Sequence, residues 1–396
     1  MFVRRLLLCL SLCAALLLCA CGQSAEPAVE PVAEPTPTAA QTPTPAPAPT
    51  PTPEPDYPAG DTVTVDGTEL GEGRLIDGAL CVRLDDFLAA AGIDAETDGE
   101  TLRFRWRKAD VSLDLGSGAL LRGETETALG ALPLWHGERY VPVEALCGAL
   151  DISLFYDEEY ARLYCTSAAG DWSVPEGYAV PVFMYHGVSD AIWGEAELFC
   201  SPSQIAEQFQ WLNDNGYDTI WFSDLEHVED YDKPILLTFD DGMLNNYTEL
   251  YPLLEAYQIK ATFFIVSSFT DGHDKNYMTA EQVAELAESG LVDIQSHSYS
   301  HPELYRLGAA EQEFQLAQSK LDLVRLTGRE PYVLCYPRGC ENQTTRQLVE
   351  EYYRFGVKMG GPLYVTGDDE TLIYRFYIRR FFGAATIAEL LARNGL

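Results

Sequence analysis

The sequence predicts an α/β fold, a distorted or incomplete (β/α) barrel preceded by a small α+β domain. Three observations support this prediction. From residue 179 onward, apolar and β-branched strands alternate regularly with amphipathic helices, which is typical of a parallel sheet. The number of these units, without a Gly-rich dinucleotide-binding turn, favours a barrel over an open sheet. Between residues 61 and 166 the strands are shorter and alternate in polarity.

The chain begins with a segment typical of an export signal. Residues 1–20 carry Arg4 and Arg5, followed by an almost unbroken run of Leu, Ala and Cys. The run ends in Leu-Cys-Ala-Cys, which resembles a bacterial lipobox and implies that Cys21 becomes the lipid-modified first residue. An uncleaved or ordinarily cleaved signal is the alternative. Residues 21–58 are rich in Pro, Thr, Ala and Glu, so we expect an extended tether of about 3 Å per residue.

Residues 59–168 contain a weak internal repeat. A strand pair around Asp-Gly at 77–78 leads into a helix at 84–91, and one around His-Gly at 136–137 leads into a helix at 143–150. This region resembles the N-terminal-like domain of copper amine oxidases, which recurs as a stalk in Gram-positive surface proteins. His136 is its only histidine, so a binding or spacing role is expected in place of copper chemistry.

Residues 178–396 are expected to form the barrel. The predicted strands are 179–185, 218–221, 235–239, 260–266, 291–295, 332–336, 355–359 and 377–381. The predicted helices are 203–215, 244–257, 279–289, 309–327, 344–353 and 386–393. The candidate site residues fall at or just beyond the carboxyl ends of the predicted strands, where barrel enzymes place their active sites: His186, Asp240, Asp241, His297 and Pro337.

Two short motifs predict a hydrolytic metal site. Thr-Phe-Asp-Asp-Gly at 238–242 follows an apolar strand, and adjacent carboxylates there would repel each other unless a cation or proton shares the site. His-Ser-Tyr-Ser-His at 297–301 supplies two nitrogen ligands. Asp241, His297 and His301 would form a three-ligand site with a position open for water, which is typical of catalytic zinc. Zinc is the default, and nickel, cobalt or manganese would also fit these ligands.

These motifs resemble those of the polysaccharide deacetylase family, carbohydrate esterase family four, from about residue 181 to the C-terminus. The segment Pro-Val-Phe-Met-Tyr-His-Gly-Val at 181–188 is similar to the opening strand of the subgroup that deacetylates poly-N-acetylglucosamine. The resemblance implies removal of N-acetyl groups from a glycan, with Asp240 as the general base. It also implies that His186 is the general acid, because no histidine follows His301.

One further role follows from the resemblance, and another from the chemistry of the last predicted strand. Cys-Tyr-Pro-Arg-Gly at 335–339 occupies the place of the family's third motif, and Arg338 stands where an aromatic residue is usual. The backbone N–H of Arg338 would hold the oxyanion, because a main-chain donor does not depend on the side chain. Arg380, in the last predicted strand, is the candidate partner for the catalytic carboxylate, with Arg375 and Arg379 as neighbours of equal chemistry.

Composition limits the partners. Of 396 residues, 26 are Lys or Arg and 61 are Asp or Glu, a formal charge of -35 that disfavours nucleic acid and an anionic membrane surface. We therefore expect an N-acetylated glycan as substrate, membrane attachment only through the N-terminal lipid, and a monomer. The expected location is the outer face of a bacterial, Gram-positive cell membrane.

Two alternatives to N-deacetylation remain open, an O-acetyl esterase acting on glycans and a non-catalytic wall-binding lipoprotein. Outside the signal and lipobox, six cysteines are read as small core residues or possible disulfide partners and not as metal ligands: Cys81, Cys147, Cys165, Cys200, Cys335 and Cys340.

Overall fold

The structure is a computed structural model that describes residues 56–396. The predicted export signal, the lipidation site Cys21 and most of the predicted tether lie outside the described residues. Within the described part of the chain, no helix has both the length and the apolar character needed to cross a membrane.

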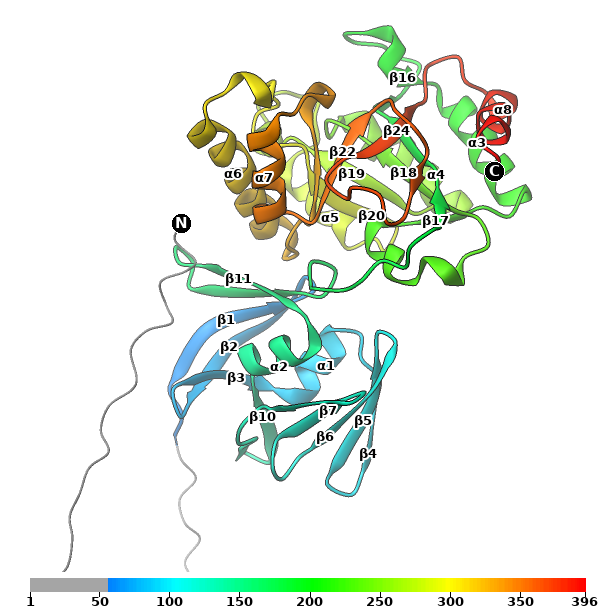
Figure 1. Cartoon of the computed structure of the whole chain (residues 1–396). Coiled ribbons are helices and arrows are strands. Elements are labelled where there is room, and N and C mark those ends of the chain that lie inside the picture. Colours follow the sequence, from blue (N-terminus) through cyan, green and yellow to red (C-terminus); the bar gives the residue numbers. More distant parts are fainter. Residues whose placement is uncertain (1–55) are drawn as a thin grey trace, which may run out of the picture. The chain divides into compact units, whose positions relative to one another are not determined.

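The N-terminal domain consists of two sheets with two helices between them (Figure 1). Among residues 56–396, one sheet has seven strands in the order β11-β12-β1-β2-β3-β10-β9 and the other has five in the order β4 to β8. The elements are β1 (Ala59–Val65), β2 (Thr68–Ile76), β3 (Ala79–Arg83), α1 (Leu84–Ala90), β4 (Ala95–Asp98), β5 (Thr101–Trp106), β6 (Ala109–Asp114), β7 (Ala119–Arg122), β8 (Thr125–Ala128), β9 (Leu134–Trp135), β10 (Glu138–Pro142), α2 (Val143–Leu150), β11 (Ser153–Asp157) and β12 (Arg162–Thr166).

The internal repeat is confirmed as β2-β3-α1 and β9-β10-α2. Each hairpin turns through two residues with positive φ, 52° and 85° at Asp77 and Gly78, and 51° and 80° at His136 and Gly137. Two positive φ angles are what a tight turn between right-twisted strands requires. The two helices then bury their apolar faces against both sheets in one core.

The C-terminal domain is a barrel, as predicted. Within the described residues, seven parallel strands close into a ring in the order β14-β24-β22-β21-β20-β19-β18, because β18 pairs with β14. β17 adds to the first residues of β18. The strands are β14 (Val182–Tyr185), β17 (Asp218–Ile220), β18 (Pro234–Phe239), β19 (Ala261–Ile265), β20 (Val292–Ser296), β21 (Val333–Cys335), β22 (Phe355–Met359) and β24 (Ile373–Tyr377).

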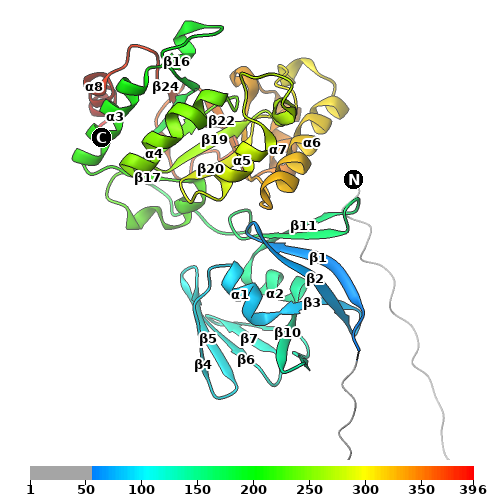
Figure 2. The same ribbon diagram turned by 180° about the vertical axis from the view of Figure 1, so that it is seen from behind.

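Helices surround the barrel. Figure 1 shows α6 and α7 along one side, and Figure 2 shows α4 and α5 from behind. Serine and threonine side chains begin α3 and α5 by accepting a hydrogen bond from the third backbone N–H of the helix. The helices are α3 (Pro202–Asp214), α4 (Tyr251–Tyr257), α5 (Ala280–Ala287), α6 (Ala309–Thr327), α7 (Gln343–Tyr352) and α8 (Ala384–Arg393).

Two predicted elements differ from the structure. The helix expected at 244–257 is divided into a π-helical turn, Asn246–Leu250, and α4. The last strand was expected at 377–381 but lies at Ile373–Tyr377, where its inward positions alternate through Ile373 and Arg375. A buried arginine interrupts the apolar pattern by which sequence analysis recognises a strand.

Candidate active site

The candidate residues converge at one end of the barrel. Asp240 and Asp241 follow the last residue of β18, His297 follows β20, and His186 follows β14. Because parallel strands place their carboxyl ends on the same face, loops far apart in sequence meet there. They line one cavity of about 480 Å³ together with His301, Arg338, Arg375 and Tyr377.

Asp241, His297 and His301 form a group that could hold a metal ion. The Oδ1 atom of Asp241 lies 3.5 Å from Nε2 of His297 and 3.6 Å from Nε2 of His301. Ligands about 2.1 Å from a tetrahedral ion lie roughly 3.4 Å from one another, so these separations fit a shared ion. The mixed nitrogen and oxygen donors also fit a divalent transition metal.

Neighbouring groups affect the protonation of the two histidines and therefore their ability to bind a metal. Nδ1 of His297 lies 2.8 Å from the carbonyl oxygen of Cys335, so a proton on Nδ1 leaves Nε2 free to bind a metal. Burial, together with the charge of His297, lowers the pKa of His301 to about 4, which keeps its imidazole neutral. Burial raises the pKa of Asp241, but contact with His297 outweighs this effect and the pKa is lowered. A bound ion would take the place of the proton shared between Asp241 and Nε2 of His297.

Asp240 is held by a buried arginine. Nη1 of Arg375 donates to Oδ1 at 2.7 Å and Nη2 donates to Oδ2 at 2.8 Å, while Nη1 also reaches Oγ1 of Thr238 at 2.8 Å. Burial alone would raise the pKa of Asp240, but the charge and hydrogen bonds of Arg375 outweigh it, so this pKa is lowered. The two-point contact fixes both the charge and the orientation of the carboxylate.

The prediction that Arg380 holds the catalytic carboxylate is wrong. Arg380 follows the end of β24 and its Nη1 donates to the carbonyl oxygen of Phe199 at 3.4 Å. Arg379 is exposed and pairs with Glu197 at 3.6 Å. Arg375 takes the role because its position within β24 directs it into the barrel.

Cys335 is a site residue that the sequence did not reveal. Its Sγ lies 3.5 Å from Oδ2 of Asp240 and accepts from Nη2 of Arg375 at 3.0 Å. Cys335, Asp240 and His297 make up a second group of side chains that could hold a metal ion. The sequence predicts only a core or disulfide role for Cys335. All six cysteines of the described region are free thiols. The spatial neighbours of a cysteine at the end of a strand depend on the order of the strands, so they cannot be predicted before that order is known.

His186 lines the cavity, but no carboxylate among the described residues forms a hydrogen bond or ion pair with its ring. Its ring lies 5.8 Å from that of Tyr377, and its buried Nδ1 has no hydrogen-bond partner among the described residues. Burial lowers the pKa of His186, although Asp240 and Asp241 oppose this effect. The acid role stays a prediction, and it requires a proton to reach His186 during the reaction.

Arg338 lies in the turn Pro337–Gly339, with φ of 57° and an exposed side chain at the cavity. A positive φ is uncommon for a residue other than glycine, and such strain is found frequently at functional sites. The oxyanion role of its backbone N–H stays a prediction.

Comparisons with known proteins place this geometry in context. Residues 227–355 match the family model described as polysaccharide deacetylase. Over 184 residues the chain is 33% identical to YxkH of Bacillus subtilis (strain 168), covering 45% of this chain and 63% of that protein. Over 134 residues it is 31% identical to the poly-beta-1,6-N-acetyl-D-glucosamine N-deacetylase of Escherichia coli (strain K12). This alignment covers 29% of this chain and 20% of that protein. The chain thus spans less than two thirds of either relative.

Solved structures share the fold. The deacetylase PplD of Streptococcus pyogenes, in complex with acetate, aligns with a TM-score of 0.50 at 23% identity over 54% of this chain and 98% of that one. BC0361 of Bacillus cereus, a polysaccharide deacetylase, aligns with a TM-score of 0.51 at 19% identity. The alignment covers 75% of this chain and 98% of that one. Residues 227–355 are thus similar to polysaccharide deacetylases in sequence, and the barrel shares its fold with solved deacetylases.

Proposed function

We propose that this protein is a metal-dependent hydrolase that removes N-acetyl groups from the amino sugars of a cell-wall or extracellular polysaccharide and releases acetate. The observation that carries this proposal is the meeting, in a single cavity, of three side chains that could hold a metal ion and one arginine-paired carboxylate. The similarity to a poly-beta-1,6-N-acetyl-D-glucosamine N-deacetylase supports an N-acetylated glycan as the substrate.

The proposed chemistry divides among the residues of the cavity. A divalent ion, with zinc as our assignment, would polarise the acetamide carbonyl and make water acidic near neutral pH when held by Asp241, His297 and His301. Asp240, kept ionised by Arg375, accepts the proton of the attacking water. His186 delivers a proton to the departing amine, and the backbone N–H of Arg338 donates to the developing oxyanion.

We further propose that the protein acts outside the cell, attached to the outer face of a bacterial membrane through a lipid on Cys21. The apolar leader and its Leu-Cys-Ala-Cys ending support this location. Metabolic labelling with a fatty acid analogue is expected to mark the wild type and leave Cys21→Ala unlabelled.

Acetate release from a panel of glycans tests the activity. We expect acetate from poly-β-1,6-N-acetylglucosamine, peptidoglycan or chitin oligomers, and loss of that release with a chelator. Release only from O-acetylated xylan would favour the esterase alternative. No release from any substrate, with metal supplied, would favour the non-catalytic one.

Metal content tests the ligands. We expect about one divalent ion per chain, and at least a tenfold loss of metal affinity in His297→Ala and in His301→Ala, because each removes one of three ligands. His273→Ala is the matched control, since the side chain of His273 is 88% exposed and pairs with Asp271. Full occupancy in the His297→Ala, His301→Ala double variant would contradict the assignment.

The role of His186 is tested by comparing two leaving groups. His186→Ala is expected to keep its metal and to lose roughly 10²-fold of its rate on amides, the usual range for loss of an acid–base group. An activated aryl acetate should lose far less, because its leaving group departs without a proton. His227→Ala serves as the control histidine outside this cavity. Equal losses on both substrates would assign His186 a structural role.

A further inference from the structure

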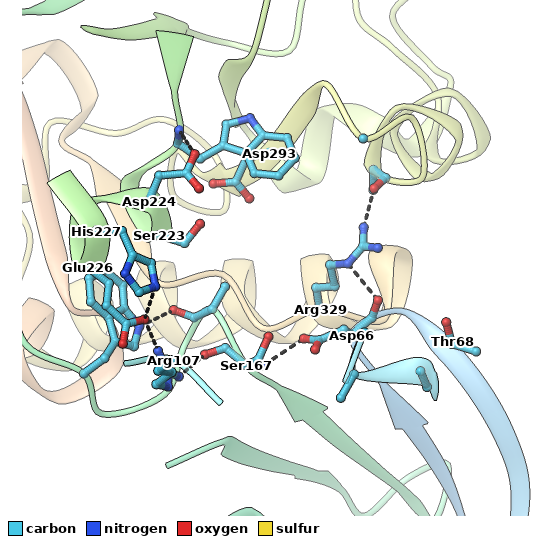
Figure 3. Close-up of a pocket in the computed structure, with 18 of the residues that line it drawn as sticks. Asp66, Thr68, Arg107, Ser167, Ser223, Asp224, Glu226, His227, Asp293 and Arg329 are labelled. Atoms are coloured by element: carbon cyan, nitrogen blue, oxygen red, sulfur yellow. Dashed lines mark hydrogen bonds and ion pairs between the residues drawn. The ribbon is translucent and has the colours of Figure 1, made fainter. Parts of the chain in front are cut away.

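A second cavity, of about 650 Å³, lies away from the candidate active site. It is near the amino ends of the barrel strands, because Asp293 is the second residue of β20 whereas His297 follows the last. Figure 3 shows Asp224 and Asp293 facing the cavity from one side, with Arg107, Ser167 and Asp66 on the other. Both folded domains contribute to its walls.

Direct contacts between the domains hold these walls in place. The guanidinium of Arg107 forms a buried ion pair with Glu226 of the barrel, while its Nη2 donates to the carbonyl oxygen of Ser167 at 3.0 Å within the N-terminal domain. Nε of Arg329 donates to the carbonyl oxygen of Asp66 at 2.9 Å. The cavity is therefore preformed, and its volume lies in the range of small-ligand sites.

The lining has an excess of negative charge. Two arginines, Arg107 and Arg329, face five acidic residues, which are Asp66, Asp224, Glu226, Glu288 and Asp293. Glu226 and Asp224 have cationic partners, Arg107 and Lys260.

Asp66 and Asp293 form no ion pair among the described residues. Asp66 accepts from the backbone N–H of Ser167 at 2.8 Å, and Asp293 accepts from Tyr332 at 2.9 Å and Gln295 at 3.0 Å. Burial raises the pKa of Asp66 and raises that of Asp293 to about 6. A ligand cation would relieve the desolvation of both carboxylates.

Apolar and donor groups accompany this charge. Three indole rings line the cavity, those of Trp106, Trp172 and Trp221. Each ring already has a cationic side chain near its centroid, Arg107 at 5.4 Å from Trp106, Arg354 at 3.8 Å from Trp172 and Lys260 at 4.7 Å from Trp221, so the indoles offer apolar surface to a ligand. The Arg107 side chain is only 9% exposed, and its Nε has no hydrogen-bond partner among the described residues.

We propose that this cavity binds a glycan residue bearing a free, protonated amine. An amino sugar combines an ammonium group for Asp293 or for Asp66 on the opposite wall, an apolar ring face for the indoles and hydroxyls for the remaining polar groups. The proposal rests on the proposed function for the origin of the amine, since deacetylation produces it. Binding in this second cavity, away from the candidate active site, would retain the protein on glycans that are already partly deacetylated.

Calorimetry with defined oligomers tests the proposal. The full chain carrying Asp240→Asn prevents turnover, and the probes are a glucosamine tetramer, its fully N-acetylated counterpart and spermidine. We expect the glucosamine tetramer to bind at least about tenfold more tightly than the acetylated one, because a charge-assisted contact is worth that much. Its affinity should also fall as salt rises.

Two variants locate the binding. Asp293→Asn removes one carboxylate, and Ala91→Arg introduces a cation at the end of α1, where Ala91 lines the cavity. Each is expected to weaken the glucosamine tetramer about tenfold while leaving acetate release by an otherwise wild-type chain unchanged. Equal affinity for both tetramers, or unchanged affinity in both variants, would overturn the proposal. Spermidine binding as tightly as the tetramer would overturn the sugar assignment. Absence of acetate release would refute the proposed function alone, because these binding measurements do not depend on turnover.

Discussion

Asp240→Asn is expected to retain its metal and to lose about 10³-fold of its rate of acetate release, within the range for loss of a general base. The amide keeps the size of the carboxylate but cannot accept the proton of the attacking water. Asp241→Asn is expected to lose the metal as well, because Oδ1 of Asp241 is the atom that lies near both histidine Nε2 atoms. The measurement is kcat together with metal content on the same preparation.

An exposed carboxylate provides the control for this pair. Asp271→Asn removes an acidic side chain that is 53% exposed and outside the cavity, so both rate and metal content should match the wild type. If Asp240→Asn and Asp241→Asn lose metal and rate to the same degree, the separation of base from ligand is wrong. The contrast matters because the two residues are adjacent in sequence and differ only in what each contacts.

Much of this fold could be predicted because its strands are apolar on both faces. All six residues of β18 are buried, and such a run between amphipathic helices indicates a parallel strand. The strand ends then located Asp240, Asp241 and His297 on one face of the barrel. The local sequence shows that these residues follow the ends of strands. Because the carboxyl ends of all the parallel strands lie on one face of the barrel, the meeting of these residues could be predicted without knowing the strand order.

The residues that sequence analysis missed depend on neighbours across the barrel. Arg375 lies in a strand that pairs with β14 and β22, and its partner Asp240 is 135 residues away. Among Arg375, Arg379 and Arg380, only the register of β24 decides which points inward. Cys335 was missed for the same reason, because its contacts come from β18 and β24.

Arg375→Met is expected to destabilise the protein by about 3 to 5 kcal/mol, because it leaves the buried carboxylate of Asp240 without its cation. The Arg375 and Asp240 side chains are only 2% and 4% exposed, so solvent cannot replace the lost partner. The pKa of Asp240 is lowered in the folded protein, so this pair stabilises the fold above the unfolded aspartate value, about 3.9, and the contribution is lost as pH falls further. Urea unfolding at neutral and acidic pH measures both effects.

The double variant Asp240→Asn, Arg375→Met separates pairing from packing. Removing both charges leaves no buried ion unpaired, so the double variant is expected to be more stable than Arg375→Met alone at neutral pH. Arg380→Met is the matched control, since Arg380 contacts a backbone carbonyl and not the catalytic carboxylate, and it should change stability by no more than about 1 kcal/mol. A double variant no more stable than Arg375→Met would show that the arginine acts by filling space. The rate of acetate release should fall in Arg375→Met even where the protein is fully folded, because Asp240 then loses the two hydrogen bonds that hold its charge and orientation.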